Sequence, residues 1–382
     1  MNKVKLGEVA DVNRNSFLVT DFDEILYLDT SSVTKGVFDD FIRLSKSDKI
    51  PSRAKRGVRD KTIVYSTVRP NLQHFGIFDK TRDNVVVSTG FATIDIKKNL
   101  VDPKFLFYYL TQDKFTNYLH TIAANNVSSY PSINPSDLEN LELEIPKDID
   151  TQTSIADVLS SLDDKIALNN KINKELEDLA KTIYDYWFVQ NADEKWEKGR
   201  LSDIANITMG QSPDGISYNE NGEGIIFYQG CTDFGVMFPM IRLFTTAPTR
   251  FAEIGDILLS VRAPVGKINF ADKKCCIGRG LAALNSKMGS ITHLYYILKN
   301  METVFNRRNT DGTTFGAINK DDLFSLSITK PSKEALMRFE EIAKPLFDKQ
   351  FLIAKEKLLL TQLRDWQLPM LMNGQVSVEN RL

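Results

Sequence analysis

The sequence predicts an α+β protein that consists of two similar halves, each followed by one long helix. Three observations support this prediction. Short motifs of the first half recur in the second half in the same order. Each half contains short β-rich runs followed by an amphipathic stretch. Each half also ends in a long apolar pattern with a helical period.

Five motifs carry the repeat. Lys5-Leu6-Gly7-Glu8-Val9 corresponds to Arg200-Leu201-Ser202-Asp203-Ile204 at an offset of 195 residues, and the offset falls to 185 for the last pair, as loop insertions and deletions would produce. The other pairs are Ser66-Thr67-Val68-Arg69-Pro70 with Ser260-Val261-Arg262-Ala263-Pro264, Gly90-Phe91-Ala92-Thr93-Ile94 with Gly280-Leu281-Ala282-Ala283-Leu284, Leu106-Phe107-Tyr108-Tyr109-Leu110 with Leu294-Tyr295-Tyr296-Ile297-Leu298, and Ile133-Asn134-Pro135-Ser136-Asp137-Leu138 with Ile318-Asn319-Lys320-Asp321-Asp322-Leu323. Their common order indicates a duplication. Residues 13–60 and 209–253 share almost nothing, so the scaffold is common and some loops are individual.

Within each half we expect strands first and a helix afterwards. The β-rich runs of the first half cover residues 61–66, 84–88 and 91–96, and residues 255–260 form a similar run in the second half. Amphipathic patterns predict helices over 103–119 and 292–305. This order is typical of α+β domains and not of an alternating doubly wound sheet.

Two long helices are predicted, over about 151–189 and 333–367, with Asp150 as the first N-cap. Each would span roughly 50–58 Å, longer than a compact domain requires. Pro345 should kink the second helix or start a new turn. We expect an antiparallel, coiled-coil-like pair that relates the two copies in a pseudo-two-fold arrangement. Two amphipathic helices packed on separate domains remain an alternative. The expected seam between the helices of the antiparallel pair contains Leu162, Ile166, Asn169, Leu176, Ile183, Phe347, Phe351 and Leu358.

The composition is that of a globular protein: 382 residues, 42% of them hydrophobic, with 48 basic and 50 acidic side chains. No apolar run approaches the ~18 residues of a membrane helix, and the first residues lack the apolar core of a secretory signal. Three cysteines, two of them adjacent, cannot form a disulfide framework, which fits a reducing cytoplasm.

Motifs of catalysis are missing from the sequence. Residues 263–268 lack the first glycine and the hydroxyl of a phosphate loop, and Gly278-Arg279-Gly280 has the wrong continuation for a dinucleotide loop, so it is interpreted as a turn. Gly210-Gln211-Ser212-Pro213 breaks the nucleophile-elbow pattern. Cys and His have no metal-ligand spacing. Adenine and cytosine-amine methyltransferases carry an Asn/Asp-Pro-Pro-aromatic loop, and Ile133-Asn134-Pro135-Ser136 does not match it. We expect no cofactor, metal or catalytic residue in this chain.

Positive charge is concentrated in one region of each copy. Residues 49–69 hold seven basic side chains against Asp60 alone, and residues 250–310 hold ten against four acidic ones. Such regions neutralise phosphates, and nearby Asn, Gln and Arg side chains suit the edges of bases. The DNA-binding candidates are Arg53, Lys55, Arg56, Arg59, Arg69, Asn71, Gln73, His74, Asn125, Asn126, Tyr130, Gln211, Ser212, Gln229, Arg262, Lys267, Arg279, Arg307, Arg308 and Asn309.

The chain as a whole resembles the specificity subunit of a type I restriction–modification system. The resemblance rests on the two motif openings at residues 5 and 200, on Leu162-Asp163-Asp164-Lys165-Ile166, and on the tail from Leu368 to Val376. That tail is similar to the Leu-Pro-x-Leu-Met/Leu-x-Gly ending of the family and is the most specific piece. Pro345 within the second long helix departs from the pattern.

The resemblance implies a non-catalytic reader of double-stranded DNA with a bipartite target. Its domains would be a first target recognition domain (1–148), a first spacer helix (149–190), a second target recognition domain (191–332), and a second spacer helix with the C-terminal tail (333–382). Each recognition domain would read one half of the target, and the helices would set the spacing and dock two methyltransferase subunits. Two restriction–translocase subunits could then join. S-adenosylmethionine, ATP and Mg²⁺ are expected on those partner subunits.

Two other functions stay open from the residues alone. One is a self-contained DNA methyltransferase or nuclease, which the absent cofactor loops disfavour. The other is a coiled-coil scaffold without DNA contact, which truncation of the helix pair would distinguish.

Overall fold

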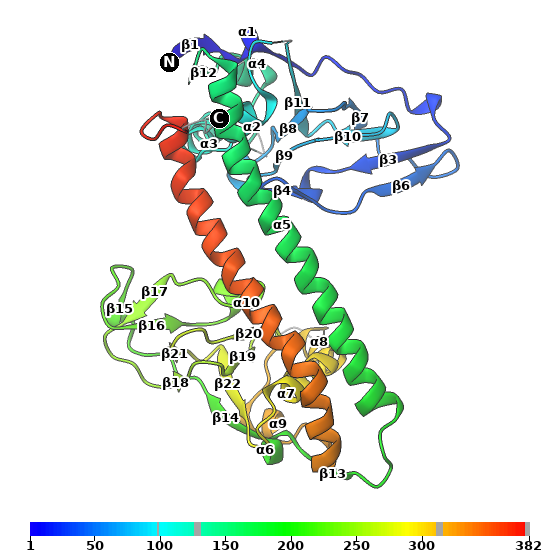
Figure 1. Ribbon diagram of the computed structural model, residues 1–382, viewed down its shortest axis with the longest axis vertical. Coiled ribbons are helices and arrows are strands. Elements are labelled where there is room, and N and C mark those ends of the chain that lie inside the picture. Colours follow the sequence, from blue (N-terminus) through cyan, green and yellow to red (C-terminus); the bar gives the residue numbers. More distant parts are fainter. Residues whose placement is uncertain (98, 126–130, 311–315, 379–382) are drawn as a thin grey trace. The chain divides into compact units, whose positions relative to one another are not determined.

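The computed structural model describes residues 1–97, 99–125, 131–310 and 316–378. The chain forms two compact units. Unit 1 is Met1–Lys165 with Leu360–Leu382, and unit 2 is Ile166–Leu359. Each unit therefore contains one recognition-domain scaffold and one stretch of each long helix (Figure 1). The division at residues 148, 190 and 332 stays a prediction.

Two four-stranded sheets form the scaffold of unit 1. One has the order β2-β11-β8-β9, and the other has the order β6-β3-β10-β7 with a parallel β3–β10 pair. A two-stranded sheet, β1-β12, joins the N-terminus to the end of the domain. The strands are β1 (Asn2–Lys5), β2 (Ala10–Val12), β3 (Glu24–Leu28), β4 (Val33–Thr34), β5 (Val37–Phe38), β6 (Ile42–Ser45), β7 (Ala54–Gly57), β8 (Ile63–Ser66), β9 (Phe75–Ile77), β10 (Val85–Ser88), β11 (Phe91–Ile96) and β12 (Glu142–Ile145).

Unit 2 repeats this plan, which confirms the predicted duplication. The order β14-β22-β19-β20 corresponds to the first sheet, and β15-β17-β16-β21-β18 to the second, again with one parallel pair, β16–β21. Lys97 Nζ donates to Gly7 O at 2.6 Å, and Lys287 Nζ donates to Ser202 O at 2.7 Å in the other copy. The strands are β13 (Glu197–Arg200), β14 (Ala205–Met209), β15 (Tyr218–Asn219), β16 (Ile225–Tyr228), β17 (Leu243–Thr245), β18 (Phe251–Ala252), β19 (Ile257–Ser260), β20 (Ile268–Phe270), β21 (Cys275–Ile277), β22 (Leu281–Ser286) and β23 (Ser327–Lys330).

Each helix predicted within a half is in fact two helices. Residues 103–119 divide into α2 (Pro103–Leu110) and α3 (Asp113–Asn125), and the second copy divides into α7 (Ile291–Asn300) and α8 (Glu302–Thr310). Gln112 lies at the first break, where its side-chain amide donates to Tyr109 O at 2.9 Å and satisfies a carbonyl at the end of α2. The amphipathic period continues across the break, so the sequence pattern does not reveal it. The short helices are α1 (Leu6–Val9), α4 (Pro135–Glu139), α6 (Leu201–Ile204) and α9 (Lys320–Phe324).

The long helices are α5 (Ile149–Asp185), which ends in a π-helical turn at Tyr186–Gln190, and α10 (Lys333–Met372). The prediction that Pro345 could start a new turn is wrong, because α10 is one continuous helix from Lys333 to Met372. Pro345 is exposed, so the Glu341 carbonyl that loses its backbone partner can bind water. The buried Phe339, Ala343 and Phe347 hold both sides of the proline against the core.

The two helices run antiparallel within each unit. In unit 2, Asn169 of α5 donates to Glu356 of α10 at 2.8 Å, while Tyr184 further along α5 meets Phe339 near the start of α10. Among the predicted seam residues, Asn169 and Phe347 are buried and the other six are half-buried. The rings of Phe347 and Phe351 pack on Phe270, so these two residues also attach α10 to the recognition domain.

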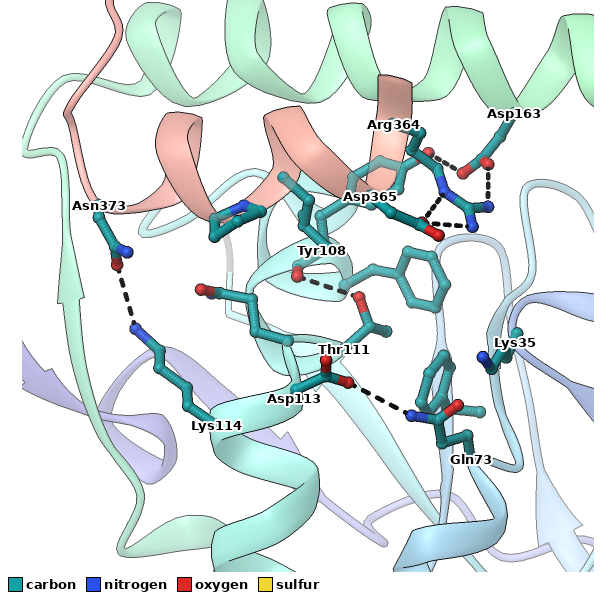
Figure 2. Close-up of a pocket in the computed structure, with 15 residues that line it drawn as sticks. Lys35, Gln73, Tyr108, Thr111, Asp113, Lys114, Asp163, Arg364, Asp365 and Asn373 are labelled. Atoms are coloured by element: carbon teal, nitrogen blue, oxygen red, sulfur yellow. Dashed lines mark hydrogen bonds and ion pairs between the residues drawn. The ribbon is translucent and has the colours of Figure 1, made fainter. Parts of the chain in front are cut away.

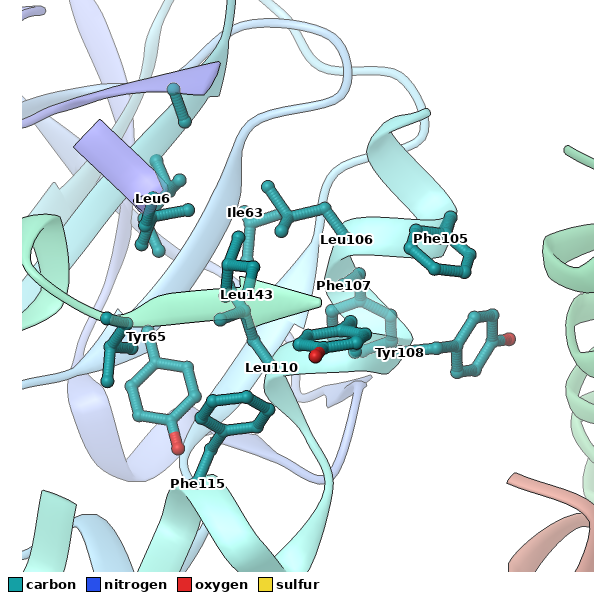
Figure 3. Close-up of a cluster of buried hydrophobic side chains, with 14 of the residues drawn as sticks. Leu6, Ile63, Tyr65, Phe105, Leu106, Phe107, Tyr108, Leu110, Phe115 and Leu143 are labelled. Carbon is teal, nitrogen blue, oxygen red and sulfur yellow. The ribbon is translucent and has the colours of Figure 1, made fainter. Parts of the chain in front are cut away.

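The long helices complete the apolar core of each unit. In unit 1 the core contains α2 residues from Phe105 to Leu110 (Figure 3). It also takes in Leu159 of α5 and Leu371 of α10. In unit 2 the core takes in Tyr184 and Phe339 from the same two helices. None of the helices in the described ranges is long and apolar enough to cross a membrane.

His293 gives the core of unit 2 a dependence on pH. Its ring is buried and packs between Tyr184, Phe188 and Phe339. Burial lowers the pKa of His293 to about 4. Because the unfolded chain binds this proton more tightly than the folded one, the stability that His293 contributes is present above about pH 6.5 and is lost as the pH falls toward 4.

We expect His293→Phe to reduce the loss of unfolding free energy between pH 7 and pH 4 by about 3 kcal/mol. Urea unfolding of the full chain at several pH values measures this slope. Burial raises the pKa of Glu340, which acts in the opposite direction, but Glu340 is present in both proteins and cancels in the comparison. A variant that loses as much stability as the parent would contradict the assignment.

Candidate nucleic-acid interface

In unit 2, several predicted DNA-binding residues converge on one turn, Gly278-Arg279-Gly280, between β21 and β22. Arg279 N donates to Ser212 Oγ at 3.3 Å. Gly280 N donates to Gln229 O at 3.2 Å, and Gln211 N donates to Ile277 O at 3.0 Å. The residues that follow β14 and β16 therefore lie against this turn. We call Gln211, Ser212, Gln229 and Arg279 the Arg279 cluster.

Glycines permit the close approach of these three backbone segments. A Cβ on Gly210 would lie 2.2 Å from Gly278 O, and a Cβ on Gly280 would lie 2.7 Å from Gln229 O. Any side chain at these positions would push the segments apart. The glycines thus hold the exposed side chains of Gln211, Gln229 and Arg279 close together.

Two further predicted cations belong to the same end of the domain. Val261 N donates to Gly280 O at 2.9 Å, and the next residue, Arg262, forms a β-bridge with Ala317. Lys267 N donates to Ser260 Oγ at 2.9 Å, where β19 ends. The guanidinium groups of Arg262 and Arg279 form no ion pair with any residue that the structure describes. The side chains of Arg307, Arg308 and Asn309 lie outside the described part.

In unit 1 the corresponding end is the turn Ser88–Gly90 between β10 and β11. Thr89 N donates to Arg53 O at 2.9 Å, and Thr67 N donates to Gly90 O at 2.8 Å. Arg69 lies two residues after Thr67, and its backbone N–H donates to Pro131 O at 2.9 Å. The structure therefore brings the segments of Arg53 and Arg69 to the equivalent end of the first domain. Asn71 and Asn125 are exposed, and Asn126 and Tyr130 lie outside the described residues.

Other candidates of unit 1 are engaged within the fold. Arg59 lies at the opposite end of β7 from Arg53, and its Nε donates to the buried Asp95 at 3.1 Å. Gln73 donates to Asp113 at 3.5 Å, and His74 Nδ1 lies 2.6 Å from Val33 O. These three side chains already have partners in the domain, so they are weaker candidates for DNA contact than their residue types suggest.

The remaining two candidates lie on β7. Lys55 is exposed, whereas Arg56 is half-buried. Burial lowers the pKa of Arg56 from its ordinary value. One residue that the sequence analysis did not single out lies beside the Arg279 cluster: Thr249, whose hydroxyl donates to Gln211 O. Its place within residues 209–253, which differ between the two copies, is the signal that would have found it.

Within the described ranges, no group of three or more His, Cys, Asp or Glu side chains could hold a metal ion. The interface consists of cations, amides and hydroxyls on turns that a sheet scaffold supports. Side chains of these types bind phosphates and base edges.

Comparison with known proteins gives one consistent result. The model of the type I restriction modification DNA specificity domain matches residues 1–178 and again 193–362. The chain is 32% identical over 300 residues to the putative type I restriction enzyme MjaX specificity subunit of Methanocaldococcus jannaschii, with 74% of this chain and 70% of that protein covered. It is 24% identical to the type I restriction enzyme HindI specificity subunit of Haemophilus influenzae, with 98% and 100% covered.

A solved structure supports the fold. The crystal structure of the type I restriction–modification system S subunit from M. genitalium is 19% identical, aligns over 97% of this chain and 95% of that one, and has a TM-score of 0.62. These matches do not favour a self-contained methyltransferase, a nuclease or a scaffold without DNA contact. The chain belongs to the family of type I restriction–modification specificity subunits, the non-catalytic components that recognise a DNA sequence through two recognition domains.

Proposed function

We propose that the Arg279 cluster, with Arg262 and Lys267, reads one half of a bipartite DNA target, and that the Arg53–Arg69 end of the first domain reads the other half. One observation carries this proposal: the repeated sheet brings cations to the same end of each domain, beside loops that differ between the copies. A common scaffold with individual loops suits two different sequences at a constant spacing. Arg279 and the two glutamines have the chemistry for guanine and adenine edges in the major groove.

The chemistry of the complete system would reside on other subunits. DNA and the other subunits of the restriction–modification system are the partners of this family. For this chain we infer two methyltransferase subunits, with two restriction–translocase subunits as optional additions. S-adenosylmethionine, ATP and Mg²⁺ would bind to those partners, and the assembly would work in the cytoplasm, where the DNA lies.

The long helices offer a surface for the methyltransferase. Leu352 and Leu359 of α10 are 64% and 65% exposed and lie two turns apart on one helical face. Leu168 and Leu179 of α5 are also large, apolar and exposed. Exposed apolar residues aligned on one face are typical of a surface that binds another protein.

Arg279→Ala should weaken binding of the assembled complex to its target DNA by about 1–3 kcal/mol and relax the sequence requirement in one half only. Lys273→Ala is the matched control, because Lys273 lies in the β20–β21 turn at the opposite end of β21. Fluorescence anisotropy at constant salt, with DNAs changed in either half, measures both effects. Equal losses for the two variants would place the interface elsewhere.

Leu359→Glu should prevent co-purification of the methyltransferase, since a charge on the docking face would have to be buried in the complex. Ile254→Glu is the control, because Ile254 is as exposed (71%) but lies on the second recognition domain. Size-exclusion chromatography of the co-expressed subunits distinguishes the two. A methyltransferase that stays bound to the Leu359 variant would exclude this face of α10.

A further inference from the structure

The structure gives a role to two charged residues of the long helices. Asp163 of α5 and Arg364 of α10 form an ion pair of 2.8 Å between Oδ1 and Nη1. The other oxygen of Asp163 accepts a hydrogen bond of 2.6 Å from the hydroxyl of Tyr108 on α2. Figure 2 shows this arrangement at the edge of a pocket of about 420 Å³ in unit 1. One carboxylate thus joins both long helices to the first recognition domain.

This joint is partly shielded from water. Tyr108 is buried, and the side chains of Arg364 and Asp163 are 22% and 33% exposed. Burial and the charge of Asp163 both raise the pKa of Tyr108, which favours the protonated hydroxyl that donates to Asp163. Burial alone would lower the pKa of Arg364. Its hydrogen bonds and ion pairs with Asp163 and Asp365 outweigh this effect, so the pKa is raised.

Unit 2 contains a second joint of the same chemistry. The hydroxyl of Tyr295 on α7 donates to Glu177 of α5 at 3.1 Å, and Lys299 Nζ lies 2.7 Å from the same carboxylate oxygen. Tyr295 is buried, and burial together with Glu177 raises its pKa. Each unit therefore has one tyrosine, one carboxylate of α5 and one cation.

The two joints are not copies of one motif. In the repeat, Tyr108 corresponds to Tyr296, and Tyr295 corresponds to Phe107. The two domains thus use neighbouring positions of equivalent helices to reach a carboxylate of α5. The same contact built twice from non-equivalent residues points to a requirement on the contact itself.

Directional bonds add to what the apolar core provides. The hydrophobic effect is itself non-directional, so an apolar core fixes the orientation of a domain only through the fit of its side chains. A charge-assisted hydrogen bond has a preferred length and angle, and it is stronger where water is excluded. The Lys171–Glu175 pair, with side chains 74% and 66% exposed, has less of this protection than the joints, whose ion-paired side chains are 22–41% exposed.

We propose that Tyr108 and Tyr295 are positioning residues that fix the orientation of each recognition domain on α5, and that the half-site spacing accepted by the protein depends on them. This inference rests on the proposed function, because it assumes that each domain reads one half of the target. Neither tyrosine contacts DNA in this account. Their effect reaches the DNA through the orientation of the reading surface.

The test uses Tyr108→Phe, Tyr295→Phe and the double variant, each in the complete complex with its methyltransferase. Each substitution removes one hydroxyl and leaves the ring in the core. Binding is measured against DNAs in which the spacer between the mapped half-sites is lengthened or shortened one base pair at a time. Tyr118→Phe is the matched control, since Tyr118 is an exposed tyrosine of α3.

We expect the ratio of the affinities for the preferred spacer and for its neighbours to fall about tenfold in each Phe variant. This is the equivalent of one charge-assisted hydrogen bond. The half-site sequences should stay unchanged. Asp163→Asn, which keeps the shape of the side chain but removes its charge, should broaden the spacer profile in the same way. A tyrosine that only stabilises the fold would lower the melting temperature and leave the spacer profile sharp.

Phe variants that keep the sharp spacer profile of the parent would overturn the inference. A parent complex that binds no bipartite DNA would instead contradict the proposed function. The control variant should match the parent in both spacer profile and melting temperature.

Discussion

Apolar side chains from both long helices complete the core of each unit, and the rest of the structure depends on this burial. In unit 1, Leu159 of α5 and Leu371 of α10 share a core with the aromatic residues of α2. These segments lie far apart in the chain, and neither helix could bury its apolar face alone. Residues of the same two helices enter both cores, so apolar burial attaches each recognition domain to this helix pair.

Much of this architecture was predictable from the sequence. The ordered repeat predicts two equivalent scaffolds, and the three- and four-residue spacing of apolar residues predicts α5 and α10. The breaks at Thr111–Gln112 and Met301 were not predictable, because the residues on both sides continue one amphipathic pattern. The continuity of α10 through Pro345 depends on tertiary contacts of Phe339 and Phe347, which a local rule for proline does not include.

The candidate site was predictable as a region but not as a set of side chains. Arg59 and Arg279 have the same charge, yet Arg59 pairs with a buried aspartate while Arg279 stands on a turn held between three backbone segments. Gln73 and His74 look like base-reading residues in the sequence and have partners inside the domain. For Arg59 the decisive factor is the end of the strand at which it lies, and for Gln73 and His74 it is a side-chain partner in a neighbouring segment. Both factors depend on the tertiary fold.

A division of labour between scaffold and loops follows from this arrangement. The cores and the tyrosines of the two joints are buried, and substitutions of buried residues are costly. The turns that we propose to read DNA carry exposed side chains and are supported by backbone bonds, so these side chains can change without loss of the fold. Under the proposed function, one half of the target could then change while the other half stays the same.

The independence of the two reading surfaces is tested most directly by exchange of one of them. Residues 1–148 are replaced by the first recognition domain of another specificity subunit, and the hybrid is co-expressed with its methyltransferase. The methylated positions in the DNA are then mapped. Our account predicts that one half of the methylated sequence changes while the other half stays the same. A change in both halves would contradict it.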